Sequence, residues 1–157
     1  MVKSPWSILT TQGDLTMNRR LYQQSHATWV CDYHIVWCSK YHGKVLGDTY
    51  IKLELKKMFK YVAQWKDLKI HAWHIGEEYI HLFLSIPPKY SVAYTIQVLK
   101  GKTSMWIKKK VKRFPLGPFW ARGYFVSTIG SNEHQIRNYI NSQRPYQYDM
   151  PTLFSPR

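Results

Sequence analysis

The 157-residue sequence predicts one α+β domain built around a single antiparallel sheet. Stretches rich in β-branched and aromatic residues alternate with stretches whose apolar residues recur at helical spacing. Two of the strand-like stretches are separated by only two acidic residues, which is typical of a hairpin. A chain of this length can bury about 70% of the surface that it exposes when unfolded, enough for one core.

The first half of the domain is expected to contain a strand, a helix and a hairpin. Residues 26–37 are rich in β-branched and aromatic side chains and predict a strand. Residues 50–65 predict an amphipathic helix, whose apolar positions are Ile51, Leu55, Met58, Phe59 and Val62. Residues 69–76 and 79–86 predict the two strands of the hairpin. The second strand ends at the two prolines that follow it, because proline cannot donate to a strand ladder.

The second half is expected to contain a helix, a last strand and a further helix. Ser91 resembles a helix N-cap, and the helix after it has a stripe formed by Val92, Ile96, Leu99, Thr103, Trp106 and Ile107. Residues 122–129 predict the last strand, and residues 133–142 predict a helix with Asn132 as its cap. The order β-α-β-β-α-β is that of the ferredoxin-like split βαβ plan, in which two helices cover one face of the sheet. We therefore predict a ferredoxin-like domain followed by a C-terminal helix.

The predicted domain spans residues 26–144. Residues 1–25 are expected to be an irregular, polar leader, and residues 145–157 a tail without clear periodicity. No apolar run approaches the roughly 18 residues needed to cross a bilayer, so no membrane segment is expected. The two cysteines, Cys31 and Cys38, cannot form a disulfide framework and fit a reducing cytoplasm.

The chain is strongly basic and rich in aromatic residues. It has 23 Lys and Arg against 9 Asp and Glu, a formal net charge of +14, and 16% of its residues are aromatic. Cationic side chains and aromatic rings are the combination that binds single-stranded nucleic acid, by neutralising phosphates and stacking bases. The plainer alternative is that the aromatic residues fill the core and the lysines keep the surface solvated. Composition does not separate the two.

The densest basic segment lies on and after the second predicted helix. We expect phosphate contacts from the cationic side chains there, which are Lys100, Lys102, Lys108, Lys109, Lys110 and Arg113. The alternative is an ordinary solvated helix face.

Three side chains could carry chemistry. In the strand over residues 79–86 the even-numbered positions are aliphatic and must face the core, so His81 lies on the opposite face, under a second layer or in a site. Tyr139 and Gln143 are four residues apart and project from one face of the last helix. A tyrosine hydroxyl needs a base or a metal-polarised target to act as a nucleophile. The alternatives are a structural or solvated histidine and a tyrosine that packs against the sheet.

Five parts of the sequence stand out together: residues 33–41 (YHIVWCSKY) with 44–46 (KVL), 80–82 (IHL) followed by 85–92 (SIPPKYSV), 99–104 (LKGKTS), 122–130 (RGYFVSTIG) and 137–143 (RNYINSQ). These segments resemble those of the IS200/IS605-family transposases. They follow the family's order and spacing over about three quarters of the chain.

This resemblance implies a single-tyrosine (Y1) HUH endonuclease. Tyr139 would attack a phosphate of single-stranded DNA and form a 5′-phosphotyrosine link. His81 would be the second histidine of the His-hydrophobic-His metal motif and Gln143 a further ligand of a divalent metal, Mg²⁺ or Mn²⁺. The resemblance also implies a homodimer that binds DNA hairpins in a prokaryotic cytoplasm, associated with the nucleoid through DNA, without a membrane or a small-molecule substrate.

The sequence departs from the family at the first metal histidine, where it has Tyr79. A phenol must lose a proton near pKa 10 before it binds a metal well, whereas a neutral imidazole binds readily. His74, Glu77 and Glu78 are candidate substitutes. Three readings therefore stay open: a strand-cleaving transposase with an altered metal site, a cleavage-deficient DNA-hairpin-binding relative, and an RNA-binding module on the same fold.

Overall fold

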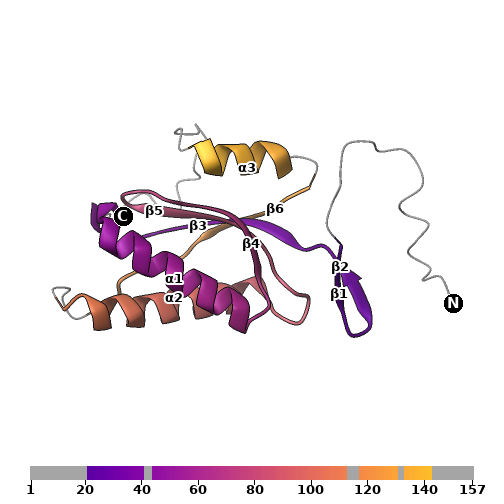
Figure 1. Cartoon of the computed structure of the whole chain (residues 1–157), viewed down its shortest axis with the longest axis horizontal. Coiled ribbons are helices and arrows are strands. Elements are labelled where there is room, and N and C mark those ends of the chain that lie inside the picture. Colours follow the sequence, from indigo (N-terminus) through magenta and orange to yellow (C-terminus); the bar gives the residue numbers. More distant parts are fainter. Residues whose placement is uncertain (1–20, 41–43, 113–116, 131–132, 143–157) are drawn as a thin grey trace, which may run out of the picture.

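A four-stranded antiparallel sheet lies between two helices on one face and a third helix on the other (Figure 1). The computed structural model describes residues 21–40, 44–112, 117–130 and 133–142. The strand order is β4-β5-β3-β6, formed by β3 (Asp32–Cys38), β4 (Lys69–Ile75), β5 (Tyr79–Ser85) and β6 (Phe125–Thr128). The helices are α1 (Thr49–Trp65), α2 (Val92–Lys110) and α3 (Glu133–Ser142), and a short 3-10 helix, η3 (Lys44–Gly47), precedes α1.

The predicted β-α-β-β-α-β order with a C-terminal helix is confirmed. In Figure 1, α1 and α2 lie side by side below the sheet and α3 lies above it. Ser91 caps α2 as expected, since its hydroxyl accepts from the backbone N–H of Tyr94 at 3.1 Å. Asp48 caps α1 in the same way, accepting from the N–H of Tyr50 at 2.8 Å.

The prediction of one strand over residues 26–37 is wrong in one respect, because this segment forms two strands. β2 (Ala27–Trp29) leaves the sheet and pairs with β1 (Tyr22–Gln24), so a small hairpin stands where the end of an irregular leader was expected. The rings of Tyr22 and Trp29 pack at 4.8 Å between centroids and stabilise this hairpin. The last strand is also shorter than expected, since Gly123 has a φ of +81° and interrupts the extended backbone before β6.

The main core lies between the sheet and the helix pair. The even-numbered residues of the 79–86 strand face this core and are at most 1% exposed, as the alternation predicts. Trp37 is fully buried and packs edge-to-face on Phe59 of α1 and on Trp120. Glu54 of α1 accepts from the indole N–H of Trp106 of α2 at 2.7 Å, which joins the two helices.

A second, smaller core lies under α3, on the opposite face of the sheet. It consists of Ala72, Phe83, Ile129, Ile136 and Ile140. His81 projects to this face, because it shares the register of Phe83 two positions along the same strand. The sheet is therefore covered on both faces. None of the described helices is long and apolar enough to cross a membrane.

Truncating the main core should cost far more stability than truncating the surface of α1. Leu82→Ala removes a fully buried side chain and should lower the free energy of unfolding by about 2–5 kcal/mol. Leu53→Ala, at a position 52% exposed, should change it by less than about 0.5 kcal/mol. Urea denaturation followed by circular dichroism measures both, and similar losses in the two variants would contradict the assigned core.

Candidate functional site

Three histidines cluster on the sheet face under α3. His74 of β4 and His81 of β5 are register partners, with ring centroids 6.2 Å apart. His34 of β3 stacks on His81 at 5.4 Å, and its Nε2 lies 3.2 Å from His81 Nδ1. Register places all three side chains on one face, so His81 occupies the centre of a row of imidazoles.

Burial keeps these imidazoles neutral. It lowers the pKa of His34 to about 4. It also lowers the pKa of His81 to about 3, with repulsion from His34 and His74 adding to the effect. The pKa of His74 is lowered by burial and by the nearby charge of Lys52. A neutral imidazole keeps a nitrogen lone pair, which suits it to bind a metal.

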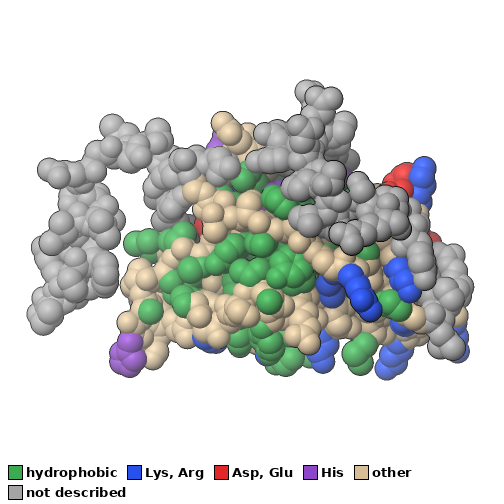
Figure 2. All heavy atoms as spheres, turned by 180° about the vertical axis from the view of Figure 1, so that it is seen from behind, with side chains coloured by type: hydrophobic (Ala, Val, Ile, Leu, Met, Phe, Trp, Pro, Cys, Tyr) green, Lys and Arg blue, Asp and Glu red, His purple; other side chains and the backbone are tan. Residues whose placement is uncertain are grey.

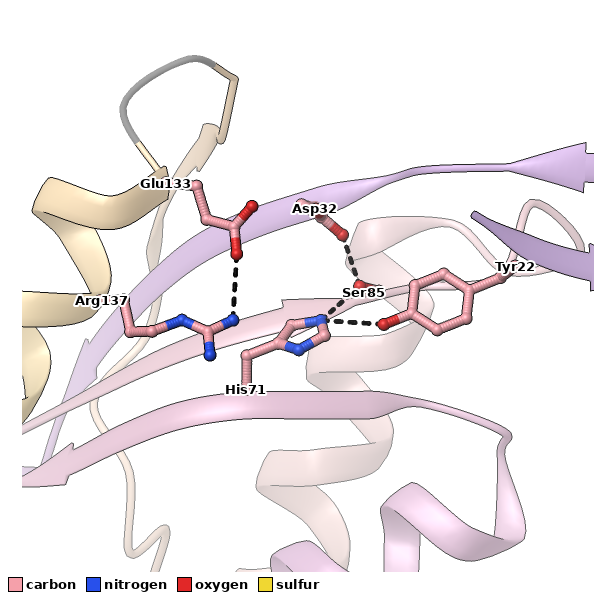
Figure 3. Close-up of polar contacts among 6 residues, drawn as sticks. All are labelled: Tyr22, Asp32, His71, Ser85, Glu133 and Arg137. Atoms are coloured by element: carbon pink, nitrogen blue, oxygen red, sulfur yellow. Dashed lines mark hydrogen bonds and ion pairs between the residues drawn. The ribbon is translucent and has the colours of Figure 1, made fainter. Parts of the chain in front are cut away.

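α3 covers this face and carries the tyrosine position. Ile136 and Ile140 pack in the same small core as Phe83. The guanidinium of Arg137 lies 5.5 Å from the Phe83 ring, and Glu133 holds it at 3.0 Å (Figure 3). Position 139 is in the last turns of α3, so the predicted nucleophile and His81 belong to elements that pack against each other. The side chain of Tyr139, and the whole of Gln143 and Asn132, lie outside the described residues.

Tyr79 is poorly suited to replace a metal-binding histidine. Burial raises the pKa of its hydroxyl, and the neighbouring Cys38 and Glu78 raise it further. The phenol therefore stays protonated at neutral pH, and a protonated phenol is a weak metal ligand. Glu77, a candidate substitute, instead has its carboxylate 3.5 Å from the ammonium of Lys44.

The described residues supply one suitable metal ligand from the predicted set. His81 fits, since it is neutral and its partner His34 orients the ring. Across the described segments, no group of three His, Cys, Asp or Glu side chains converges to hold a metal ion. A metal site here therefore needs a ligand beyond these side chains, and Gln143 is the further ligand that the resemblance implies.

A polar network at the far end of β5 escaped the sequence analysis. The hydroxyl of Ser85 donates to the carboxylate of Asp32, which leaves its oxygen to accept from Nε2 of His71 at 2.6 Å (Figure 3). The hydroxyl of Tyr22 lies 3.5 Å from the same Nε2. Ser85 is fully buried, so the network is structural and ties the β1–β2 hairpin to β3, β4 and β5. The only sequence signal was one serine among the apolar residues of the strand.

The lysines expected to bind phosphate point in different directions. The half-buried Lys100 donates to the carbonyls of Ala121 at 2.8 Å and Gly123 at 2.7 Å, and burial lowers its pKa. Lys108 donates to the carbonyl of Gly117. Lys102 lies 5.3 Å from the ring of Trp65 on α1.

The remaining basic residues of this segment lie toward the end of α2. The ammonium of Lys110 lies 4.8 Å from the Trp106 ring, and Lys109 is exposed. Arg113 lies outside the described residues. The rear view shows Lys and Arg side chains gathered toward the lower right, the side on which α2 ends (Figure 2). A cationic surface therefore exists there, without Lys100.

Comparisons with known proteins agree with the fold and the resemblance. Residues 27–143 match the family described as "Transposase IS200 like". The transposase for insertion sequence element IS200 of Salmonella typhimurium is 32% identical over 124 residues, covering 76% of this chain and 80% of that protein. The ISDra2 transposase TnpA of Deinococcus radiodurans is 28% identical over 117 residues, covering 71% of this chain and 83% of its own.

Two solved structures share the fold. A crystal structure described as that of a transposase from Deinococcus radiodurans R1 superposes with a TM-score of 0.64 at 25% identity, covering 80% of this chain and 99% of that one. A REP-associated tyrosine transposase bound to a REP hairpin superposes with a TM-score of 0.56 at 13% identity, covering 75% of this chain and 70% of that one. The second likeness supports the fold alone.

The fold should lose stability as the pH falls from about 6.5 toward 4. In this interval the unfolded chain binds protons at His34 and His81 that the folded chain does not, because folding lowers both pKa values from 6.5. Each histidine should lower the free energy of unfolding by up to about 1.4 kcal/mol per pH unit. Urea denaturation at pH 7, 6 and 5 measures this slope. His34→Gln should reduce the slope and His26→Gln, at an exposed position, should leave it unchanged; equal slopes in the two variants would contradict the assignment.

Proposed function

The chain belongs to the IS200-like transposase family, and on that premise we propose that it binds hairpin-forming single-stranded DNA and cleaves and rejoins strands through Tyr139. One observation carries the proposal: α3, which bears position 139, packs on the sheet face that presents His81. In this arrangement the tyrosine helix covers the sheet of its own chain.

The proposed reaction is a transesterification. The phenolic oxygen of Tyr139 attacks a DNA phosphorus, and the oxygen–phosphorus bond forms as the bond from phosphorus to the 3′ oxygen breaks. The phenol loses its proton and the leaving 3′ oxygen gains one, so no water is consumed. Because the phosphotyrosine keeps an ester bond, a 3′-hydroxyl of another strand can reverse the step and rejoin DNA without ATP.

We further propose a divalent metal ion, Mg²⁺ or Mn²⁺, held by His81 and Gln143. Such an ion would neutralise charge on the non-bridging phosphate oxygens and orient the phosphate for in-line attack. Tyr79 stands where the family has a histidine, and its raised pKa argues against a metal bond. His74, the register partner of His81 with ring centroids 6.2 Å apart, is a described imidazole that could supply a second nitrogen.

The second candidate function is hairpin binding without cleavage. The observation that favours it is the protonated Tyr79 phenol, which leaves the metal one ligand short of the family's set. In either case the proposed partner is a DNA hairpin, as bound in the structure of the REP-associated tyrosine transposase that shares this fold. We also propose that the protein acts as a homodimer on DNA in a prokaryotic cytoplasm, associated with the nucleoid through the DNA that it binds.

Strand cleavage should produce a covalent protein–DNA adduct that depends on Tyr139. Incubation with single-stranded hairpin DNA from the flanks of the gene, in Mg²⁺ or Mn²⁺, should yield a slower band on a denaturing gel. Tyr139→Phe should abolish the band, while Tyr61→Phe, an exposed tyrosine on α1, should retain it. An adduct that survives Tyr139→Phe would overturn the nucleophile assignment.

Restoring the family histidine should increase the affinity of the site for the metal ion. Tyr79→His adds a neutral imidazole beside His81 and should lower the Mn²⁺ concentration needed for half-maximal adduct formation by about tenfold, as metal-site ligand changes commonly do. The same titration with Tyr124→His, away from the histidine row, is the control. If only Tyr79→His forms adduct, the natural protein is the cleavage-deficient relative; if Tyr79→His changes nothing, position 79 is not a ligand site.

A further inference from the structure

A second group of aromatic and cationic side chains lies on the helix side of the molecule, away from α3. It is found where α1 ends and α2 begins, at the right-hand end of the helix pair in Figure 1. We call this the helix-end cluster, and its members are Trp65, Lys66, Lys89, Tyr90, Tyr94 and Lys102. Trp65 is 50% exposed and Tyr94 is 40% exposed, so the core does not account for either ring.

The lysines of the helix-end cluster gather around its rings. The ammonium of Lys66 lies 4.0 Å from the centroid of Trp65 and donates to the hydroxyl of Tyr94 at 2.8 Å. The ammonium of Lys102 lies 5.3 Å from the centroid of the same ring, which brings two cations to one indole. Tyr90 and Tyr94 stack at 5.5 Å with an angle of 29° between their planes. These contacts hold the aromatic rings close to positive charge at the surface.

The charge of the cluster is largely uncompensated. Asp67 pairs with Lys89 at 2.8 Å. Among the segments that the structure describes, neither Lys66 nor Lys102 forms an ion pair with an acidic side chain. A strongly basic chain thus presents two cations and two exposed rings together, a combination that suits a polyanion with flat, stackable groups.

A neighbouring pocket extends this surface toward the β1–β2 hairpin. It has a volume of about 450 Å³ and is lined by Lys89 of the cluster, by its ion-pair partner Asp67, and by Tyr22 and Trp29. The pocket therefore adds aromatic and cationic lining directly beside the helix-end cluster.

We propose that the helix-end cluster binds unpaired nucleotides of single-stranded DNA, with bases stacking on Trp65 and Tyr94 and phosphates contacting Lys66 and Lys102. Duplex DNA fits less well, because its bases already stack on one another and do not present their faces. The inference rests on the proposed function for its substrate class. It concerns a different surface, since the sheet separates the cluster from α3, so the cluster contacts DNA that flanks the cleaved phosphate.

The test is binding of a fluorescent 30-nucleotide oligo(dT) and a 30-base-pair duplex, measured by anisotropy. The double variant Trp65→Ala, Tyr94→Ala should weaken oligo(dT) binding by about tenfold or more and duplex binding by less than about twofold. Tyr61→Ala is the matched control: the ring is 57% exposed on α1 but outside the cluster, and binding should stay within about twofold. Trp65→Phe, which keeps a ring, should recover most of the loss caused by Trp65→Ala.

Salt dependence tests the lysines separately. Replacing both Lys66 and Lys102 with Gln should reduce the slope of log affinity against log salt by about 1.4 for oligo(dT), from about 0.7 per phosphate contact. Equal losses on oligo(dT) and duplex, an equal loss in Tyr61→Ala, or no binding of oligo(dT) by the wild type would each overturn the inference. If the wild type forms no adduct but binds oligo(dT) through the cluster, the cleavage proposal fails and this inference stands.

Discussion

The pairing register of β5 decides what every other part of the domain can do. β5 is paired on both sides, with β3 and β4, and its side chains alternate between two covered faces. Leu82 and its aliphatic neighbours meet the helix pair, while His81 and Phe83 meet α3. A slip of one residue would exchange the two sets, placing imidazole in the main core and leucine under α3. The two cores therefore hold His81 in place by excluding the alternative register.

The three histidines are polar side chains within an otherwise apolar layer between the sheet and α3. His34, His81 and His74 lie on the sheet face of Phe83, which α3 covers, and burial holds them neutral. At neutral pH the row thus adds no positive charge to a strongly basic protein, and its nitrogens keep their lone pairs. Burial also keeps the side chain of Tyr79 neutral, but it does so by raising the pKa of the phenol, so that the phenol retains its proton. One environment thus favours a histidine ligand and disfavours a tyrosine ligand.

The elements and faces that depend on local pattern were predictable from the sequence. Periodicity was sufficient for α1 and for the alternation of β5, and Ser91 marked the start of α2. Features that depend on distant partners were not. Whether residues 27–29 join the main sheet or β1 is decided by pairing across the chain, and the contact of Lys100 with Ala121 and Gly123 requires a loop to return to α2. For the site, the sequence identified His81 but not its contact with His34, since adjacency in a sheet is set by register.

The two hydrogen bonds of Lys100 give this residue a structural role. Its ammonium donates to two carbonyls of the segment that leads into β6, and so connects this edge strand to α2. If basic residues were neutralised one at a time, the Lys100 variant would show weaker DNA binding, which would then be attributed to lost electrostatic attraction for DNA. The weaker binding would in fact come from losing the hydrogen bonds that hold the β6 edge of the sheet to α2. It would therefore persist at high salt, where electrostatic attraction is already screened.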